Sequence, residues 1–582
     1  MSANQRDSVA AAPVLRLRGT AGNWTGDALC LFALAVLVTI SWLPRSSGPI
    51  DLRWDAGVYY VLGTSLAEGK GYRLLNEPGQ IRAVQYPPGL PAIIAAEELA
   101  LRTNRPETVG IWLRRSWFVL SLSYIFLAFL LGRLFLSRRY AFLLAAACLL
   151  NYEMYFISTL AFAELPFAVT STVFGFLYFK PNQGALTRWG AAISAIASYL
   201  LRTIGIALLA AWIADAAFRK QYRNALIRAG IALIPVVLWQ SYVHSVESSN
   251  SYKHPYYAYQ RDPSMFYNVS YATNLSLKSP FQPELGRAST GDLIHRVLGN
   301  LPIVPGSLGQ GITSVDLLWD GHLRALNRLL KPVTLPSWTV GLCLGVLGWL
   351  VLAGIIVQVW RGPRFIGLYL LFSVGAICVT PWAAQIPRYI APLEPFLFLA
   401  LFAGLQMIKQ AYRRIPSMRS QRILTGLTVS LLFFIPFESA VSLASGIRNF
   451  RGKAVYEDAS GKRREFWLQH YPNTFVSAVG ALNWITNHAN RKAIVAISMP
   501  QWAYLKTGLL TVMPPLEANP LQQQRLIDSV PVTYLVLDRM VMGGEFNEKF
   551  PAMVQAFPHK WSLVYSSRSG DTQVYKRADL PF

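Results

Sequence analysis

The stretch WDAGVYYVLGTSLAEGKGY occupies residues Trp54–Tyr72, shortly after the first long apolar run of the chain at Ala28–Leu43. The second residue of this stretch, Asp55, therefore lies just outside a predicted membrane span, at the start of a long polar loop. A carboxylate at that position is suited to deprotonate a hydroxyl group at the lipid surface. We predict that Asp55 is catalytic. The alternatives are a solvated loop residue and an N-cap for the helix that follows.

Apolar runs dominate the chain. It has 582 residues, of which 53% are hydrophobic and only 14% are charged, whereas a soluble domain is about a quarter charged. Runs of this length with few charges predict membrane-spanning helices. We expect a mostly α-helical, polytopic membrane protein with about 11 transmembrane helices. The runs lie near 27–43, 116–136, 139–157, 159–179, 188–201, 203–218, 226–243, 337–360, 365–383, 388–408 and 423–444.

The charges are distributed unevenly between the connections. The 54 basic and 30 acidic residues give a net charge of +24, which fits a nucleic-acid-binding protein. The basic residues are spread over the loops between apolar runs, however, which favours the positive-inside rule. If the N-terminus is cytoplasmic, every cytoplasmic connection is basic and lacks Asp and Glu; these connections are 137–139, 180–188, 219–223, 361–364 and 409–422. We therefore predict a cytoplasmic N-terminus and, after an odd number of spans, an extracytoplasmic C-terminus.

These patterns divide the chain into three parts. We expect a cytoplasmic N-terminal segment at 1–26, and a transmembrane domain at 27–444 with long extracytoplasmic loops at 44–114 and 244–335. The composition of 445–582 is that of a soluble domain. Short β-branched and aromatic runs there predict strands; they lie at 493–498, 532–537, 562–566 and 572–576. Helices are predicted at 478–490 and 520–529, so we expect a small extracytoplasmic α/β domain.

Several motifs resemble those of a known superfamily. Trp54-Asp55, Tyr59-Tyr60, the Gly-Lys-Gly-Tyr ending at Tyr72 and Tyr86-Pro87-Pro88-Gly89 together resemble the first extracytoplasmic loop of GT-C membrane glycosyltransferases. The branch they resemble contains bacterial relatives of protein O-mannosyltransferase and of the lipid A aminoarabinose transferase. Glu164 in Ala-Glu-Leu-Pro-Phe, and Arg388-Tyr389 followed by two prolines, resemble the later motifs of that superfamily. The resemblance implies a GT-C-like fold and a lipid-linked sugar donor.

The chain also departs from those motifs. Many relatives have Asp-Glu at the catalytic position, but here Ala56 follows Asp55. Tyr86 replaces the lysine of the Lys-Pro-Pro motif in the aminoarabinose transferase branch, which indicates a different donor or acceptor. The WWDYG signature of oligosaccharyltransferases is absent, so we do not expect transfer of a whole glycan to asparagine.

The remaining site candidates are cations, an acid and tyrosines. Arg388 is predicted at the outer end of a span. Arg202 interrupts an apolar run on the same side of the membrane. Arginines at such positions are functional candidates, and the alternative is that they snorkel to the lipid headgroups. Glu164 is expected to position the acceptor or to tune Asp55, or is only a polar turn residue. The substrate-binding residues that we predict are Glu164, Arg202, Arg388, Tyr389, Tyr59, Tyr60 and Tyr86. Lys253 and Arg261 are weaker candidates, and the aromatic residues between Tyr252 and Tyr271 fit either sugar stacking or an interfacial belt.

The expected reaction needs one carboxylate. A sugar on a polyprenyl phosphate has a good leaving group, so a base without a general acid suffices, and one displacement inverts the anomeric centre. We predict an inverting glycosyltransferase that moves a single hexosyl or pentosyl group from a polyprenyl-phosphate donor to a hydroxyl of a lipid, glycan or protein. The alternatives are a transporter or flippase of lipid-linked sugars, and a non-catalytic assembly partner whose C-terminal domain recruits other envelope enzymes. We expect an integral protein of a bacterial inner membrane, with membrane lipids as partners and no nucleic acid. No cofactor is predicted, and since no DxD motif is present, no metal.

Overall fold

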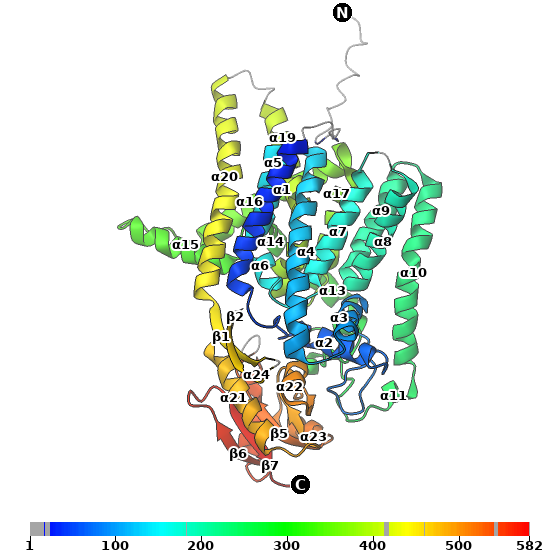
Figure 1. The fold of residues 1–582 in the computed structure, drawn as a ribbon, viewed down its shortest axis with the longest axis vertical. Helices are drawn as coiled ribbons and strands as arrows, with labels where there is room; N and C mark the ends of the chain where they lie inside the picture. The colour runs from blue at the N-terminus through cyan, green and yellow to red at the C-terminus, as the bar shows by residue number, and fades with distance from the viewer. Residues whose placement is uncertain are drawn as a thin grey trace, which may run out of the picture.

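Two structurally different parts make up the chain. The computed structural model describes residues 15, 17, 24–181, 183–412, 418–458, 460–540 and 545–580, so the expected segment 1–26 lies almost wholly outside the described residues. Helices fill the chain up to Asn449, and a smaller part with two β-sheets follows below them in Figure 1. The last helix of the bundle ends at Asn449, and the first strand begins at Arg451.

The helical part contains long and short helices. Those of its first half are α1 (Trp24–Trp42), α2 (Asp55–Ala67), α3 (Gly89–Leu101), α4 (Pro106–Phe135), α5 (Arg138–Leu150), α6 (Tyr152–Ile157), α7 (Glu164–Phe179), α8 (Ala185–Leu201), α9 (Ile206–Phe218) and α10 (Tyr222–Glu247). Those of its second half are α11 (Asn250–Lys253), α12 (Tyr271–Leu275), α13 (Thr290–Asn300), α14 (Ile303–Ile312), α15 (Asp316–Leu329), α16 (Trp338–Arg361), α17 (Arg364–Cys378), α18 (Ile386–Ile390), α19 (Glu394–Tyr412) and α20 (Met418–Asn449).

Within the described residues, six helical segments are long and apolar enough to cross a membrane. They are Trp24–Arg45, Pro106–Phe135, Tyr222–Glu247, Trp338–Arg361, Ala383–Ala411 and Thr425–Asn449. Shorter apolar helices are found at Glu164–Phe179, Thr203–Phe218 and Arg364–Cys378. The predicted count of about 11 spans is therefore not confirmed. One reason is that the apolar run at 139–157 is not one helix: it breaks at Asn151, whose side chain caps α6 by accepting a hydrogen bond from the Met154 backbone N–H at 3.1 Å.

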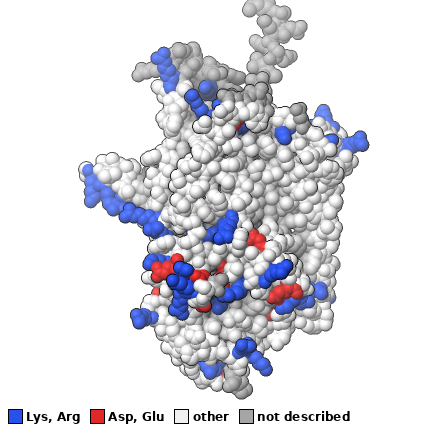
Figure 2. Space-filling model, viewed as in Figure 1, with Lys and Arg blue, Asp and Glu red and all other residues white. Residues whose placement is uncertain are grey.

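The face of the helical part seen in Figure 2 carries few charges. In Figure 2 a broad band across its middle is nearly free of Lys, Arg, Asp and Glu, while basic side chains gather near its upper end and both signs appear where the sheet-containing part begins. The helix α15 projects from one side of the bundle and carries exposed basic residues along its length, among them Arg324 and Arg328 (Figures 1 and 2). A charge-poor band with polar ends is typical of a membrane protein.

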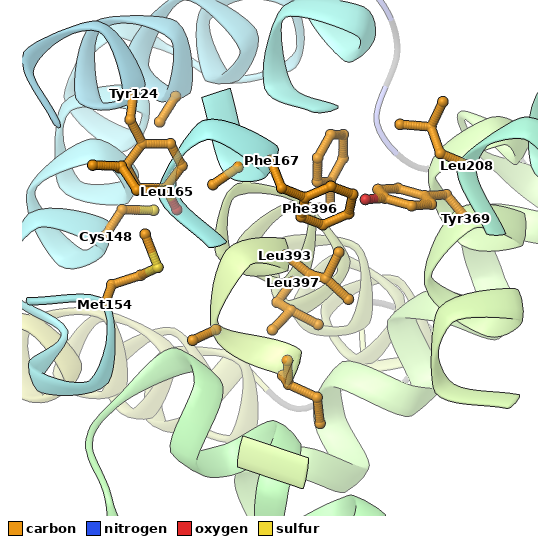
Figure 3. Close-up of a cluster of buried hydrophobic side chains, with 14 of the residues drawn as sticks. Tyr124, Cys148, Met154, Leu165, Phe167, Leu208, Tyr369, Leu393, Phe396 and Leu397 are labelled. Atoms are coloured by element: carbon orange, nitrogen blue, oxygen red, sulfur yellow. The ribbon is translucent and has the colours of Figure 1, made fainter. Parts of the chain in front are cut away.

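One large apolar core joins most of the helices in the described part of the chain. In Figure 3 the ring of Phe396 from α19 meets Tyr369 from α17, with Phe167 of α7 and Leu208 of α9 nearby, and side chains of α4, α5 and α6 continue the cluster to one side. The two rings are edge to face, with centroids 5.1 Å apart. The helix α16 approaches its neighbours at glycines: a Cβ on Gly348 would collide with the Pro305 carbonyl of α14, and one on Gly354 with the Ala400 carbonyl of α19. Small residues of this kind let membrane helices pack backbone to backbone.

The C-terminal part is an α/β structure, as predicted. Its helices and strands are β1 (Arg451–Glu457), β2 (Arg463–Gln469), α21 (Asn473–His488), β3 (Ile494–Ala496), α22 (Pro500–Thr507), β4 (Leu510–Val512), α23 (Pro520–Ile527), β5 (Val532–Leu537), α24 (Glu545–Ala556), β6 (Trp561–Ser566) and β7 (Gln573–Arg577). The strands β1 and β2 form an antiparallel pair, and the second sheet has the order β4-β3-β5-β7-β6. In that sheet β3 is parallel to β4 and β5, whereas β7 is antiparallel to β5 and β6. The four predicted strands are present; β1, β2 and β4 were not predicted.

The long loops pack on this C-terminal part. The Tyr257 hydroxyl of the second loop donates to Glu77 of the first loop at 2.8 Å, and the Thr511 backbone N–H of β4 donates to the Asn76 carbonyl at 2.8 Å. Tyr257 and Tyr259 also belong to an apolar cluster that contains residues of β3 and β4. The two loops and the C-terminal part thus form one packed layer at the end of the helical bundle.

Candidate active site

The backbone at Trp54 is unusual and starts the helix that carries Asp55. Trp54 has a φ of 55°, which bulky residues rarely adopt. Its ring is held between Phe156 and Phe475, with centroids 6.2 and 6.0 Å away, and the Arg53 guanidinium lies 4.4 Å from it. Backbone strain of this kind persists only where the surrounding packing enforces it, and it is common at functional sites. The packing of Trp54 therefore fixes the direction in which Asp55 leaves the first turn of α2.

Asp55 is held by two side chains from distant parts of the sequence. Its Oδ2 accepts a hydrogen bond from Arg388 Nη2 at 2.7 Å, and its Oδ1 accepts one from the Tyr267 hydroxyl at 3.1 Å. Arg388 comes from α18, and Tyr267 from the long loop before α12. The carboxylate is thus oriented and is bonded to a permanent cation.

Arg388 is shared between two carboxylates. Its Nε donates to Glu164 Oε1 at 2.6 Å, and the same oxygen of Glu164 pairs with Arg202 Nη1. Glu164, at the start of α7, has a side chain that is 0% exposed. Arg202 lies in extended backbone where α8 ends, before a 3₁₀ turn at Thr203–Gly205 leads into α9. Two guanidinium groups and two carboxylates therefore alternate in one row, with the buried Glu164 holding both cations.

Asp55 and the arginines face a cavity of about 420 Å³ between the helical bundle, the loops and the C-terminal part. Aromatic residues are the commonest lining, and the C-terminal part closes one side. The lining residues are Trp54, Asp55, Tyr59, Gln85, Tyr86, Arg202, Phe266, Tyr267, Tyr271, Phe281, Pro381, Trp382, Ala383, Ala384, Gln385, Arg388, Tyr389, Ser498, Met499, Gln501, Trp502 and Met513.

Most of the predicted site residues meet at this cavity. The lining includes Asp55, Arg202, Arg388, Tyr389, Tyr59 and Tyr86, and the rings of Tyr59 and Tyr86 lie 4.7 Å apart. Glu164 lies behind the two arginines that it binds. Tyr60 is not brought to the cavity, because successive residues of a helix point about 100° apart; its buried hydroxyl donates to the Asn104 carbonyl at 2.9 Å.

The weaker candidates lie elsewhere. Arg261 donates to the backbone carbonyls of Asn268 and Arg82, and Lys253 is an exposed residue at the end of α11. Neither residue lines the cavity. Among the described residues no group of three or more His, Cys, Asp and Glu side chains could hold a metal ion. The Arg388 guanidinium occupies the place between Asp55 and Glu164.

Some cavity residues were not predicted individually. Tyr267 fell within an aromatic stretch whose role the sequence left open, and its hydrogen bond to Asp55 has no local signal. Gln501 and Trp502 precede β4 in what reads as an ordinary soluble domain, and nothing in their spacing indicates contact with the membrane part.

Comparison with known proteins supports the fold. No family model matches the chain, and no curated protein matches it. Among solved structures, the archaeal oligosaccharyltransferase AglB from Archaeoglobus fulgidus, in complex with an inhibitory peptide and a dolichol-phosphate, matches with a TM-score of 0.51 at 13% identity, over 95% of this chain and 75% of that chain. The chain has the GT-C fold. The fold expected from the motifs around Asp55 is therefore confirmed.

A second GT-C structure also matches. ArnT from Cupriavidus metallidurans, bound to undecaprenyl phosphate, has a TM-score of 0.48 at 13% identity, over 95% of this chain and 98% of that chain.

Proposed function

We propose that this chain is an inverting glycosyltransferase that moves one sugar from a polyprenyl-phosphate donor to an acceptor hydroxyl. The observation that carries the proposal is that Asp55 lines a cavity together with Arg388 and Arg202, and is held there by Arg388 and Tyr267. The GT-C fold supports it, because AglB, which shares that fold, is an oligosaccharyltransferase solved with dolichol-phosphate.

The reaction uses the carboxylate and the cations in one step. The acceptor oxygen attacks the anomeric carbon while its proton passes to Asp55, and the bond from that carbon to the phosphate oxygen breaks. The phosphate keeps the electron pair, so no general acid is needed, in contrast to the two carboxylates of glycosidases. A single displacement inverts the anomeric centre.

The arginines would stabilise the departing phosphate. Each guanidinium carries five N–H groups, which is more than the contacts of Arg388 and Arg202 to Asp55 and Glu164 occupy. Hydrogen bonds from arginine to phosphate are short and strong, and they act best in a site that excludes water. The buried Glu164 keeps both cations in place before the donor binds.

The arrangement of the chain in the membrane follows from the same proposal. We place residues 1–26 in the cytoplasm, and the loops 44–114 and 244–335 together with 445–582 on the opposite side of a bacterial inner membrane. The basic connections support this orientation, and a donor carried on a polyprenyl lipid reaches a cavity beside the bilayer by lateral diffusion.

The decisive experiment compares the wild-type protein with Asp55→Asn, which keeps the shape of the side chain and removes its basicity. Both proteins are produced in cells that lack the endogenous chain, and glycans, glycolipids and proteins of the envelope are analysed by mass spectrometry. We expect one sugar of defined mass to be absent with Asp55→Asn and present with Asp316→Asn, a change at an exposed residue of α15. Unchanged envelope sugars with Asp55→Asn would refute the proposed base.

A second measurement separates transfer from transport. Lipid-linked sugars extracted from the cells are incubated with the purified protein in liposomes, together with an envelope extract that supplies the acceptor hydroxyls, and the free polyprenyl phosphate is quantified. A transferase releases it, whereas a flippase leaves the lipid-linked sugar intact.

A further inference from the structure

One wall of the cavity comes from the C-terminal part, and it lies close to the proposed base. Its residues are Ser498, Met499, Gln501, Trp502 and Met513. The helix α22 packs on α2 at Gly57, two residues after Asp55: a Cβ on Gly57 would lie 3.4 Å from the Cβ of Gln501 and 3.2 Å from the backbone nitrogen of Trp502. An acceptor whose hydroxyl gives its proton to Asp55 therefore lies next to this wall of the cavity.

Gln501 offers a polar group that the rest of the described chain does not use. The residue is 3% exposed and lines the cavity. Its side-chain amide makes no hydrogen bond to any residue that the structure describes. Nearly all buried polar side chains of folded proteins have a partner, so the amide of Gln501 is left for whatever fills the cavity.

The charged side chains that line the cavity already have partners of opposite charge. Of its described lining, Asp55, Arg202 and Arg388 are the residues with a permanent charge at neutral pH. Both arginines are paired with Glu164, and Arg388 also with Asp55; the donor phosphate requires these cations. An anionic acceptor would find no further cation, and a cationic one would have to bind the base itself. A buried charge without a partner is costly, so the cavity selects a neutral acceptor.

We propose that the acceptor is a neutral sugar residue of a glycan, bound by the Gln501 amide against the ring of Trp502. This inference rests on the proposed function. An amide donates to one sugar hydroxyl and accepts from another, while aromatic faces pack on the C–H faces of a sugar ring. A small number of polar groups among aromatic walls is the usual composition of a small-molecule site. Gln501 and Trp502 thus set the acceptor class, while Asp55 performs the proton transfer.

Binding to the full-length protein in lipid nanodiscs tests the inference without knowledge of the donor. The probes are methyl glycosides of neutral hexoses and pentoses, an uncharged peptide of Ser, Thr and Gly, and glucose 1-phosphate, each measured by saturation-transfer NMR. We expect binding of at least one neutral glycoside, with a Kd about tenfold higher in Gln501→Leu, as befits the loss of a hydrogen-bonding group. The control Gln522→Leu, at an exposed position of α23, should bind like the wild type. Binding of the peptide or of the phosphate alone would overturn the inference.

Unfolding of the C-terminal part would also weaken binding in Gln501→Leu, so its thermal midpoint is compared with that of Gln522→Leu. If its midpoint falls, Gln501→Met, which keeps the length of the side chain and lacks the amide, is tested in its place, and a Kd equal to that of the wild type in this folded variant counts against the inference.

The envelope analysis then separates the two proposals. Loss of the same sugar from a neutral glycan in both Asp55→Asn and Gln501→Leu supports both of them. Loss from a serine or threonine of a protein, or from a phosphorylated lipid, leaves the proposed function standing and overturns the acceptor class. No loss with Asp55→Asn refutes the proposed function, and the NMR result alone then decides whether the wall binds sugars.

Discussion

Arg388 and Asp55, which are 333 residues apart in the sequence, are joined by a hydrogen bond of 2.7 Å between Nη2 and Oδ2. Arg388 also donates to Glu164 at 2.6 Å, so the orientation of the proposed base depends on a carboxylate in another helix. The pairing means that loss of Glu164 should affect both the stability of the bundle and the geometry at Asp55.

The first prediction concerns Glu164→Gln. This change removes the charge of a side chain that is 0% exposed and that binds two arginines. Breaking a buried ion pair leaves uncompensated charge and costs about 3–5 kcal/mol. We expect a lower midpoint of thermal unfolding for the purified protein and a loss of transfer activity.

The matched control is Glu465→Gln. Glu465 lies on β2, its side chain is 64% exposed, and it pairs with Lys453 of β1 at 2.8 Å. Surface pairs contribute about 0–1 kcal/mol, so its midpoint should hardly change. Equal midpoints for the two variants would show that the row of charges around Glu164 does not stabilise the protein.

The second prediction concerns Tyr267→Phe. This variant keeps the ring at the cavity wall and removes the hydroxyl that donates to Asp55 Oδ1 at 3.1 Å. Because a hydrogen bond to a charged group is worth about 1.5–3 kcal/mol, kcat should fall roughly tenfold or more, with little change in the KM of the donor. Tyr504→Phe, on α22 but outside the cavity lining, serves as the control and should retain full kcat. A change confined to KM would indicate that Tyr267 binds substrate and does not position Asp55.

The candidate residues that line the cavity and have a local signal could be picked out from the sequence. Asp55, Arg202 and Arg388 break apolar patterns near predicted membrane ends, and a charge in such a place is rarely without a function. The strand predicted at 532–537 coincides with β5, because its β-branched and aromatic run has no competing helical period.

The parts that were missed depend on tertiary packing. Tyr267 and Gln501 reach the cavity only because the long loop and α22 fold over the end of the bundle, and one sequence carries no record of such contacts. Tyr60 was grouped with Tyr59 because they are adjacent in the sequence, but in α2 they point to different sides. The span count differed because hydropathy marks an apolar run without stating whether a residue such as Asn151 divides it.

The third prediction concerns the close approach of α16 and α19. A Cβ on Gly354 would overlap the Ala400 carbonyl, which belongs to the backbone and cannot simply rotate away. Gly354→Ala should therefore destabilise the bundle by about 1–3 kcal/mol, the usual cost of overpacking. Gly341→Ala, in the same helix, meets no atom within 4 Å and should be neutral or slightly stabilising, because alanine favours helix. Thermal unfolding in one detergent compares the two, and an equal or smaller loss for Gly354→Ala would mean that the helices separate without cost.

The last prediction concerns pH and the attachment of the C-terminal part. The His470 ring follows β2, stacks on Phe450 with centroids 4.7 Å apart, and lies 3.0 Å from the Tyr152 hydroxyl of α6 through its Nε2. Burial and the nearby Arg53 guanidinium lower the pKa of His470 from 6.5 to about 4. Between those two values the unfolded chain binds a proton that the folded chain does not bind.

The part of the stability that depends on a neutral His470 is therefore fully present above pH 6.5. As the pH falls towards 4 this part is lost, and the free energy of unfolding decreases by about 3 kcal/mol at most. The variant His470→Asn cannot take up this proton, and asparagine tolerates the positive φ of 47° at this position. We expect the thermal midpoint of the wild type to fall more steeply between pH 6.5 and pH 4.5 than that of His470→Asn. Carboxylates that titrate in the same range affect both proteins alike, so the difference between the two slopes isolates His470, and parallel slopes would contradict its lowered pKa.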